Sequence, residues 1–194
     1  PWGRDKISVL LTQLFDRYEA GLVGFDVVFA EPDESSGLSV LDELAAGPLA
    51  GNTQFRDTLV SMRPGLDRDA LLARTIVNYP VVLGYYFNDS SKGLQSGKLP
   101  SPALSKEHFG GRKIPFLEAS GFGANLEQLQ DAALGAGHFN PGIDADGVVR
   151  RVPMLFKYDD ALYESLSLAM VRLALGEKSI AAGFPEESVA GGTY

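Results

Sequence analysis

Stretches with a helical spacing of apolar residues alternate with short β-branched and aromatic runs along most of this chain, and few folds satisfy that alternation. Residues 5–20 carry apolar side chains at i, i+3, i+4 and i+7, which predicts an amphipathic helix with Gly21 as its C-terminal cap. Residues 22–30 form a short apolar run that ends in EPD, which indicates a buried strand with acids at its end. The pattern predicts a sheet with helices packed on it.

The same alternation continues toward the C-terminus. Further helices are predicted at residues 67–78, 125–137 and 165–175, and further strands at 81–87, 114–120 and on both sides of 142–153. Residues 31–66 are interpreted as a long irregular excursion with one short helix near 40–46, and residues 88–102 as a surface loop. The predicted fold class is therefore α/β: a single domain with a mixed β-sheet, helices packed on it and a late β-hairpin.

Composition excludes several classes of protein. The 194 residues include no cysteine, so disulfides, thiolate zinc sites and a cysteine nucleophile are ruled out. The formal net charge of -8 argues against nucleic-acid partners and against an anionic lipid surface, because both need clustered Lys and Arg. The longest uncharged run, residues 75–88, is shorter than the roughly 20 apolar residues of a spanning helix. The first residues also lack signal-peptide features, so a targeting or anchoring segment is expected only outside this sequence.

The stretch GIDADGVVRRVP, residues 142–153, favours a tight turn between two strands. Asp146-Gly147 is a dipeptide typical of two-residue hairpin turns, and VVRRV has the composition of an outgoing strand. A calcium site of the EF-hand kind is the alternative, because Asp144 and Asp146 occupy the third and fifth positions of such a loop. However, the stretch has Gly at the first position and Pro at the twelfth, where an EF-hand has acidic ligands. Without the terminal bidentate acid, it fails as an EF-hand loop.

The paired arginines of this stretch have a structural interpretation. Alternation along a strand places Arg150 and Arg151 on opposite faces, so only one of them can point inward. A buried guanidinium needs an acid beside it, and the candidates are Asp26, Asp144 and Asp146. A salt bridge that ties the last strands to the sheet is favoured over direct contact with a ligand.

Acids also gather at the end of the first predicted strand. Asp26, Glu31 and Asp33 lie where open α/β sheets usually bind ligands and metals. With Asp144 and Asp146 they would make a carboxylate metal hydrolase, which is kept as an alternative. The chain has only two histidines, neither in a His-x-x-x-His arrangement, so such a site would rest on carboxylates alone.

Familiar catalytic motifs are missing from the sequence. SGFGANL, residues 120–126, follows a predicted strand and opens a predicted helix, but Leu126 occupies the third small position of a dinucleotide fingerprint. There is no nucleophile elbow and no Walker lysine. His138 is interpreted as a satisfied core histidine. Six aromatic residues are interpreted as core, with packing at the chain entry as the alternative for the first of them: Trp2, Phe25, Phe29, Tyr85, Tyr86 and Phe87. No catalytic residue, cofactor-binding residue, metal ligand or cofactor is predicted.

The order of the motifs resembles a known family. WGR at the start, VGFDVVFAEPD after the first helix, LDRDALLARTI leading into VVLGYYF, and GHFNPGIDADGVVRRVPMLF followed by YESLSLAMVRLALG resemble the CHASE2 family of bacterial extracytoplasmic sensor domains. The resemblance covers nearly the whole chain. Its most specific parts are the FD strand with EPD and the D-x-D-G-V-V-R-R-x-P segment; the loops at 34–66 and 88–112 contribute little.

The resemblance implies a role without a ligand. It implies a periplasmic or extracellular signal-input domain at 1–176 and a C-terminal tail at 177–194 that leads toward a membrane segment. In the full-length protein, membrane helices would pass the signal to a nucleotide cyclase, which is favoured, a histidine kinase or a Ser/Thr kinase. The expected partners are an unidentified small molecule or periplasmic signal and a second copy in a homodimer; a ligand-free structural or dimerisation domain is the other alternative.

The positions to examine combine the motifs of the family with the acids of the first strand. They are Arg4, Asp26, Glu31, Asp33, Asp69, Asp144, Asp146, Gly147 and Arg150. Whether they contact a ligand or hold the fold stays open at this point.

Overall fold

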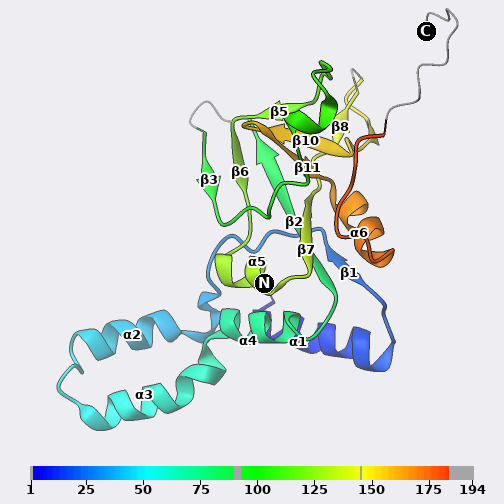
Figure 1. The fold of residues 1–194 in the computed structure, drawn as a ribbon. Coiled ribbons are helices and arrows are strands. Elements are labelled where there is room, and N and C mark those ends of the chain that lie inside the picture. Colours follow the sequence, from blue (N-terminus) through cyan, green and yellow to red (C-terminus); the bar gives the residue numbers. More distant parts are fainter. Residues whose placement is uncertain (1, 90–92, 145, 184–194) are drawn as a thin grey trace, which may run out of the picture.

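The computed structural model describes residues 2–89, 93–144 and 146–183 of the chain. Most of the helices gather at one end of the molecule, where two of them form a projecting pair, and two sheets extend from this helical end toward the other end (Figure 1). The single α/β domain with mixed sheets confirms the predicted fold class. None of the described helices has the length and apolarity to cross a membrane.

The helices follow the predicted order, with one addition. The helical segments are α1 (Arg4–Thr12), the π-helical turn η1 (Gln13–Arg17), the 3-10 turns η2 (Glu34–Ser36) and η3 (Lys106–Phe109), α2 (Leu38–Ala46), α3 (Thr53–Leu66), α4 (Arg68–Ile76), α5 (Glu127–Ala132) and α6 (Leu166–Ala174). Asp67 caps α4 by accepting from the N–H of Ala70, and Ser165 caps α6 by accepting from the N–H of Leu168. The two helices lie within the predicted ranges 67–78 and 165–175.

Strand β2 (Val81–Asn88) is the centre of the larger sheet. Its first half lies between two parallel neighbours, β1 (Val23–Phe25) and β7 (Gly135–His138). Its second half pairs antiparallel with β6 (Gly121–Gly123), which continues to β3 (Gln95–Ser96). Because β2 is buried on both faces over its first five residues, it appears in the sequence as a continuous apolar run.

Gly84 makes the centre of this sheet possible. A side chain at this position would collide with the carbonyl of Phe25, 2.3 Å from an ideal Cβ, and with the ring of Phe139. The absence of a side chain allows β1 to lie against β2 at this level.

The second sheet has the order β4-β11-β10-β5. Its strands are β4 (Leu104–Ser105), β5 (Glu118–Ala119), β10 (Leu155–Tyr158) and β11 (Ala161–Glu164). Strands β10 and β11 form an antiparallel hairpin, whereas β5 pairs parallel with β10. The two sheets share a core in which the ring of Phe87 contacts the rings of Phe156, Tyr158 and Tyr163.

The predicted late hairpin forms between β8 (Gly142–Ile143) and β9 (Val149–Arg151). The N–H of Asp144 donates to the carbonyl of Val148, and the N–H of Gly147 donates to the carbonyl of Asp144. Gly147 has a φ of 79°, which glycine adopts without strain. Because Asp144 and Val148 are the closing pair, three residues connect them, and the predicted two-residue turn is wrong in length.

Five other local predictions are wrong. The buried strand predicted at residues 22–30 is only β1, Val23–Phe25, and its residues are half-buried. Residues 53–66, interpreted as irregular, form α3, whose apolar spacing is obscured by Pro64 near its end. Most of the predicted strand at 114–120 is outside any sheet, with only Glu118 and Ala119 paired. Glu19 takes the positive φ after the first helix, so Gly21 is not the cap. The predicted helix at 125–137 is only α5, and Asn125 lies before it, fully buried.

The buried side chain of Asn125 hydrogen-bonds to two backbone groups of the larger sheet and of the segment after β1. Its side-chain oxygen accepts from the N–H of Phe29 at 2.8 Å, and its side-chain nitrogen donates to the carbonyl of Gly84 at 3.0 Å. The amide thereby satisfies two backbone groups that the short β1 leaves without ladder partners. It fixes the segment after β1 against β2.

Candidate functional site

The candidate site is built around Arg4, the first residue of α1. Its guanidinium forms an ion pair with the carboxylate of Asp69 in the first turn of α4, and both side chains are about nine-tenths buried. The guanidinium also donates to the backbone carbonyl of Glu31, in the segment that follows β1. One arginine therefore joins the first helix, α4 and the chain after the first strand.

Asp33 closes this arrangement. Its Oδ2 accepts from the N–H of Arg4 at 2.6 Å, and its own N–H donates to Oδ2 of Asp69 at 2.9 Å. The residues Arg4, Glu31, Asp33 and Asp69 are called the Arg4 network below. Each charged group in the buried part of the network has a partner, which is the condition under which a buried ion pair is tolerated.

The network also shapes the electrostatics of Asp33. Partial burial by itself would raise the pKa of the Asp33 carboxyl. Hydrogen bonds from the Ser35 side chain and from the N–H groups of Arg4 and Ser35 outweigh that effect, so the pKa lies below its usual value. Asp33 is therefore ionised at neutral pH and caps the η2 turn through Ser35.

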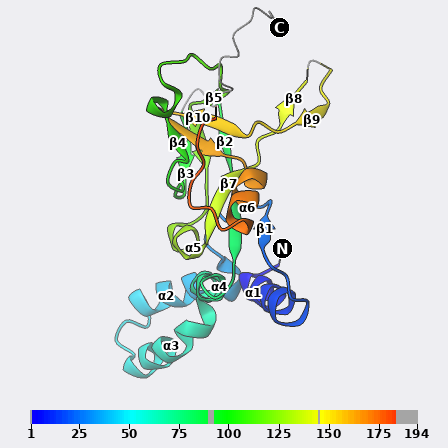
Figure 2. The ribbon, with the colours of Figure 1, turned by 45° about the vertical axis from the view of Figure 1, so that its right-hand side comes forward.

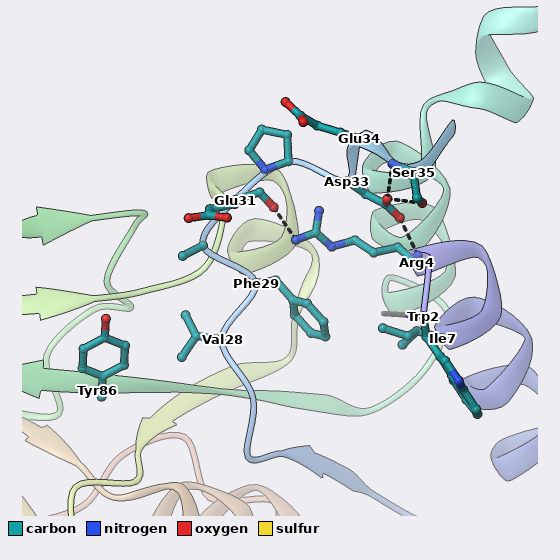
Figure 3. Close-up of a pocket in the computed structure, with 12 residues that line it drawn as sticks. Trp2, Arg4, Ile7, Val28, Phe29, Glu31, Asp33, Glu34, Ser35 and Tyr86 are labelled. Carbon is teal, nitrogen blue, oxygen red and sulfur yellow. Dashed lines mark hydrogen bonds between the residues drawn. The ribbon is translucent and has the colours of Figure 1, made fainter. Parts of the chain in front are cut away.

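A cavity of about 600 Å³ lies beside the network, and its walls are largely apolar. Figure 3 shows Ile7 of α1 and Val28 and Phe29 of the segment after β1 along it, with Tyr86 of β2 on the far side. The Arg4 guanidinium lies 5.3 Å from the centre of the Phe29 ring. We call this cavity the N-terminal pocket.

Acidic groups form the rim of the N-terminal pocket. Glu31 and Glu34 line it, and Figure 3 shows their carboxylates directed away from the Arg4 guanidinium. The guanidinium is engaged by Asp69 and by the Glu31 carbonyl, so it does not offset the charge of these two acids. The pocket thus combines an apolar interior with a negative edge, an arrangement suited to binding.

Trp2 is the residue of this pocket that sequence reasoning misplaced. It was interpreted as core, but it lies on the pocket wall with 67% of its surface exposed. Tyr86, also expected in the core, is 40% exposed because alternation along β2 turns it outward. The signal available in the sequence was the WGR motif, which places Trp2 two positions before Arg4.

The remaining candidate residues lie elsewhere. Asp26 follows the last residue of β1, is exposed, and takes no part in the network. Asp144, Asp146 and Arg150 belong to the β8–β9 hairpin, which Figure 2 shows projecting far from α1. The eight side chains therefore divide into the Arg4 network, an isolated Asp26 and a hairpin cluster.

The hairpin cluster is a set of exposed salt bridges. Arg150 donates to both oxygens of Asp146 at 2.9 Å and to Asp144 at 3.1 Å. Arg151 also reaches Asp144, because an irregularity in the β8–β9 pairing removes the strict alternation of faces. Hydrogen bonds from Arg150 and from the N–H of Val148 lower the pKa of Asp146 below its usual value.

These contacts correct two expectations. The predicted salt bridge was to tie the last strands to the sheet, but its partners all belong to the hairpin itself. Neither arginine points into the core, since both are exposed. The acids that a hydrolase would need are divided between opposite ends of the molecule (Figure 1), and no three His, Asp or Glu side chains of the described residues could share a metal ion.

Replacing Arg150 with alanine is expected to change stability very little. Solvent and salt screen the pairs it makes, and exposed pairs of this kind contribute little. The melting temperature, followed by circular dichroism, should shift by no more than about 2 °C. A decrease of ten degrees or more would show that the hairpin cluster supports the core.

One comparison with known proteins identifies the chain. The sequence profile of the CHASE2 domain matches residues 1–192, nearly all of the 194 residues. No curated protein and no solved structure matches the chain.

Proposed function

Because this chain belongs to the CHASE2 domain family, we propose that it is the signal-input part of a transmembrane receptor. The CHASE2 domain is an extracytoplasmic sensory domain and is not itself catalytic. We propose further that adjacent membrane helices carry its conformational changes to a cytoplasmic nucleotide cyclase. A histidine kinase and a Ser/Thr kinase are the other outputs that this family resemblance allows.

The Arg4 network is the observation that carries the proposal. It connects the start of α1 to α4 and to the segment that lines the N-terminal pocket. An occupant of the pocket would contact Glu31 to Ser35, whose positions depend on Arg4. A displacement of this segment would move the beginning of α1. A ligand that binds more tightly to the displaced arrangement than to the original one would shift the population between these two states.

An exposed apolar face on α1 supports a homodimer. Trp2, Val9 and Leu10 are 67%, 62% and 40% exposed, and with Leu71 of α4 they line a shallow groove. A second copy related by a two-fold axis would cover this face with the same face of its partner. In such a dimer, rotation of one α1 against the other is a direct route to the membrane helices.

Labelling of introduced cysteines tests the location, because this chain has none of its own. In the full-length protein on intact cells, Asp57→Cys on the exposed face of α3 should react with a membrane-impermeant maleimide. Val82→Cys, fully buried in β2, should react only after denaturation. Labelling of Asp57→Cys only after the cells are permeabilised would contradict an extracytoplasmic domain.

A second experiment tests signal transmission. Trp2→Ser changes the wall of the N-terminal pocket at an exposed position, so the fold should persist. We expect it to change nucleotide cyclase activity in membranes by about fivefold or more, the lower range of allosteric coupling. Val60→Ser, equally exposed on α3, should leave the activity unchanged. Equal activity in both variants and the wild type would favour a structural domain.

A further inference from the structure

A second cavity, of about 360 Å³, lies at the opposite end of the molecule from the Arg4 network. Its apolar surface comes from Phe109 of η3, from Ile114 and Phe116 of the following segment, and from Leu162 of β11. The rings of Phe109 and Phe116 meet edge to face at 5.3 Å, and Phe109 and Leu162 are buried. A volume of this size is at the lower end of the range of small-molecule pockets, roughly 300–1,000 Å³.

A turn with two glycines forms the rim of this cavity. Gly110 and Gly111 have φ angles of 56° and 79°, a region that other residues rarely adopt. They reverse the chain after η3, and the N–H of Arg112 donates back to the carbonyl of Phe109 at 3.0 Å. The turn thereby places Arg112 and Lys113 at the edge of an apolar surface.

The rim is strongly cationic in a chain whose net charge is -8. Lys106, Arg112, Lys113 and Lys157 line the cavity, and Asp160 is the single carboxylate that does so. We call it the basic pocket.

Internal pairs leave part of this charge uncompensated. Lys106 pairs with Asp160, and Lys157 pairs with Glu118 at 2.8 Å. Within the described parts of the chain, Lys113 makes no hydrogen bond or ion pair. Positive charge in excess of the carboxylates therefore remains beside a floor of apolar side chains.

We propose that the basic pocket binds a small organic monoanion with an apolar body, of the class of aromatic or branched-chain carboxylates. The body would lie against Phe109, Ile114 and Phe116, where burial of apolar surface is favourable. The carboxylate would accept a hydrogen bond from Lys113, and such a bond is stronger with a charged acceptor than with a neutral one. Neither half of the pocket alone would select such a ligand, and together they favour it over neutral aromatics and over small ions.

The basic pocket shares three side chains with a neighbouring cavity near the C-terminal end of the described chain. Phe109, Ile114 and Phe116 line both cavities, and residues 180–183 contribute to the wall of the second one. Ile180 and Ala182 pack against the cluster of Leu104, Phe109 and Leu162. An occupant of the basic pocket would thus contact residues that pack against this segment. The coupling of binding to this segment rests on the proposed receptor function, whereas the binding of the ligand does not depend on that function.

Phenylacetate is the probe that tests the binding, with the 194-residue chain in solution. We expect saturable binding by calorimetry and saturable shifts of the Ile114 methyl signals in NMR spectra, weakened by added salt. Phenylacetamide, neutral and of the same shape, and acetate, which has no apolar body, should each bind at least about tenfold more weakly. Phenylacetamide binding as tightly as phenylacetate would overturn the assignment of an anion site.

Matched variants locate the site. Lys113→Gln should weaken phenylacetate binding about tenfold, the loss expected for one hydrogen bond to a charged group. Lys113 is exposed, so the variant should fold, and circular dichroism would check it. Arg56→Gln, an exposed cation on α3, should bind as the wild type does. No shift at Ile114 up to the solubility limit of the probe, or equal binding by both variants, would overturn the proposal irrespective of the receptor's topology.

Discussion

Asp69→Ala is expected to lower the free energy of unfolding by about 3–5 kcal/mol, as measured by urea denaturation. The substitution leaves the Arg4 guanidinium buried with only the Glu31 carbonyl as a partner, and it removes the acceptor of the Asp33 N–H. An unpaired buried charge costs far more than the net contribution of the pair. The change also opens the junction of α1 and α4, so the loss should be accompanied by a lower unfolding cooperativity.

Two controls separate this buried pair from an ordinary salt bridge. Arg63→Ala breaks the pair with Asp42, in which both side chains are at least 40% exposed, and should cost less than about 1 kcal/mol. The double variant Arg4→Met, Asp69→Leu removes both charges and should lose less stability than Asp69→Ala alone. If Asp69→Ala and Arg63→Ala lowered the free energy of unfolding by the same amount, the Arg4 network would contribute no more to stability than an exposed salt bridge.

The stability of the domain should decrease as the pH falls from about 6.5 to about 4, with a contribution of about 3 kcal/mol from His138. His138 is fully buried, and burial lowers its pKa to about 4. Rings of Phe87 and Phe156 lie 6.0 and 5.5 Å from its own, and neither of its ring nitrogens has a hydrogen-bond partner among the residues that the structure describes. It is thus a core histidine as predicted, but not a satisfied one.

The direction of this pH dependence follows from which of the two states, folded or unfolded, binds the proton more tightly. Between the folded pKa of about 4 and the unfolded value of about 6.5, the unfolded chain holds more protons on His138 than the folded one. Stability is therefore fully present above pH 6.5 and is lost progressively below it. In an extracytoplasmic domain, this places acid sensitivity in the core, at the end of β7 beside β2.

His138→Leu should flatten this part of the pH profile, because an apolar side chain of similar size cannot take up the proton. Urea unfolding at several pH values would measure it, and the difference from the wild type is the quantity to compare, since the carboxylates titrate equally in both proteins. A wild-type slope in His138→Leu would show that another group dominates the acid response.

The sequence predicts those parts of the fold in which a residue pattern occurs in only one structural environment. β2 is apolar over its first half because both of its faces are buried, and α4 and α6 carry capping residues directly before their apolar spacing. Helix α3 could not be found in this way. Leu59 is its only buried residue among those described, so the helix shows little amphipathic contrast, and Pro64 and Gly65 near its end resemble a loop.

The candidate site shows the same limit. Arg4, Asp33 and Asp69 were singled out by family resemblance, but nothing in their spacing along the chain indicates that they meet, since contacts between residues 29 to 65 positions apart depend on the fold. The hairpin cluster was easier, because its partners lie within seven residues of each other. The basic pocket escaped notice since its cations come from η3, the following turn and β10, which no linear motif unites.

The projecting pair of helices α2 and α3 begins and ends at the Arg4 network (Figure 1). The N–H of Asp33, before the pair, donates to Asp69, after it, and Arg68 donates to the Ser35 side chain. Because the two ends of this excursion are held together, its length should have little effect on the stability of the remaining domain. Closing a loop costs only about 0.6 kcal/mol more for each doubling of its length. A shorter or longer segment at this junction would therefore be compatible with the same positions of strand β1 and helix α4.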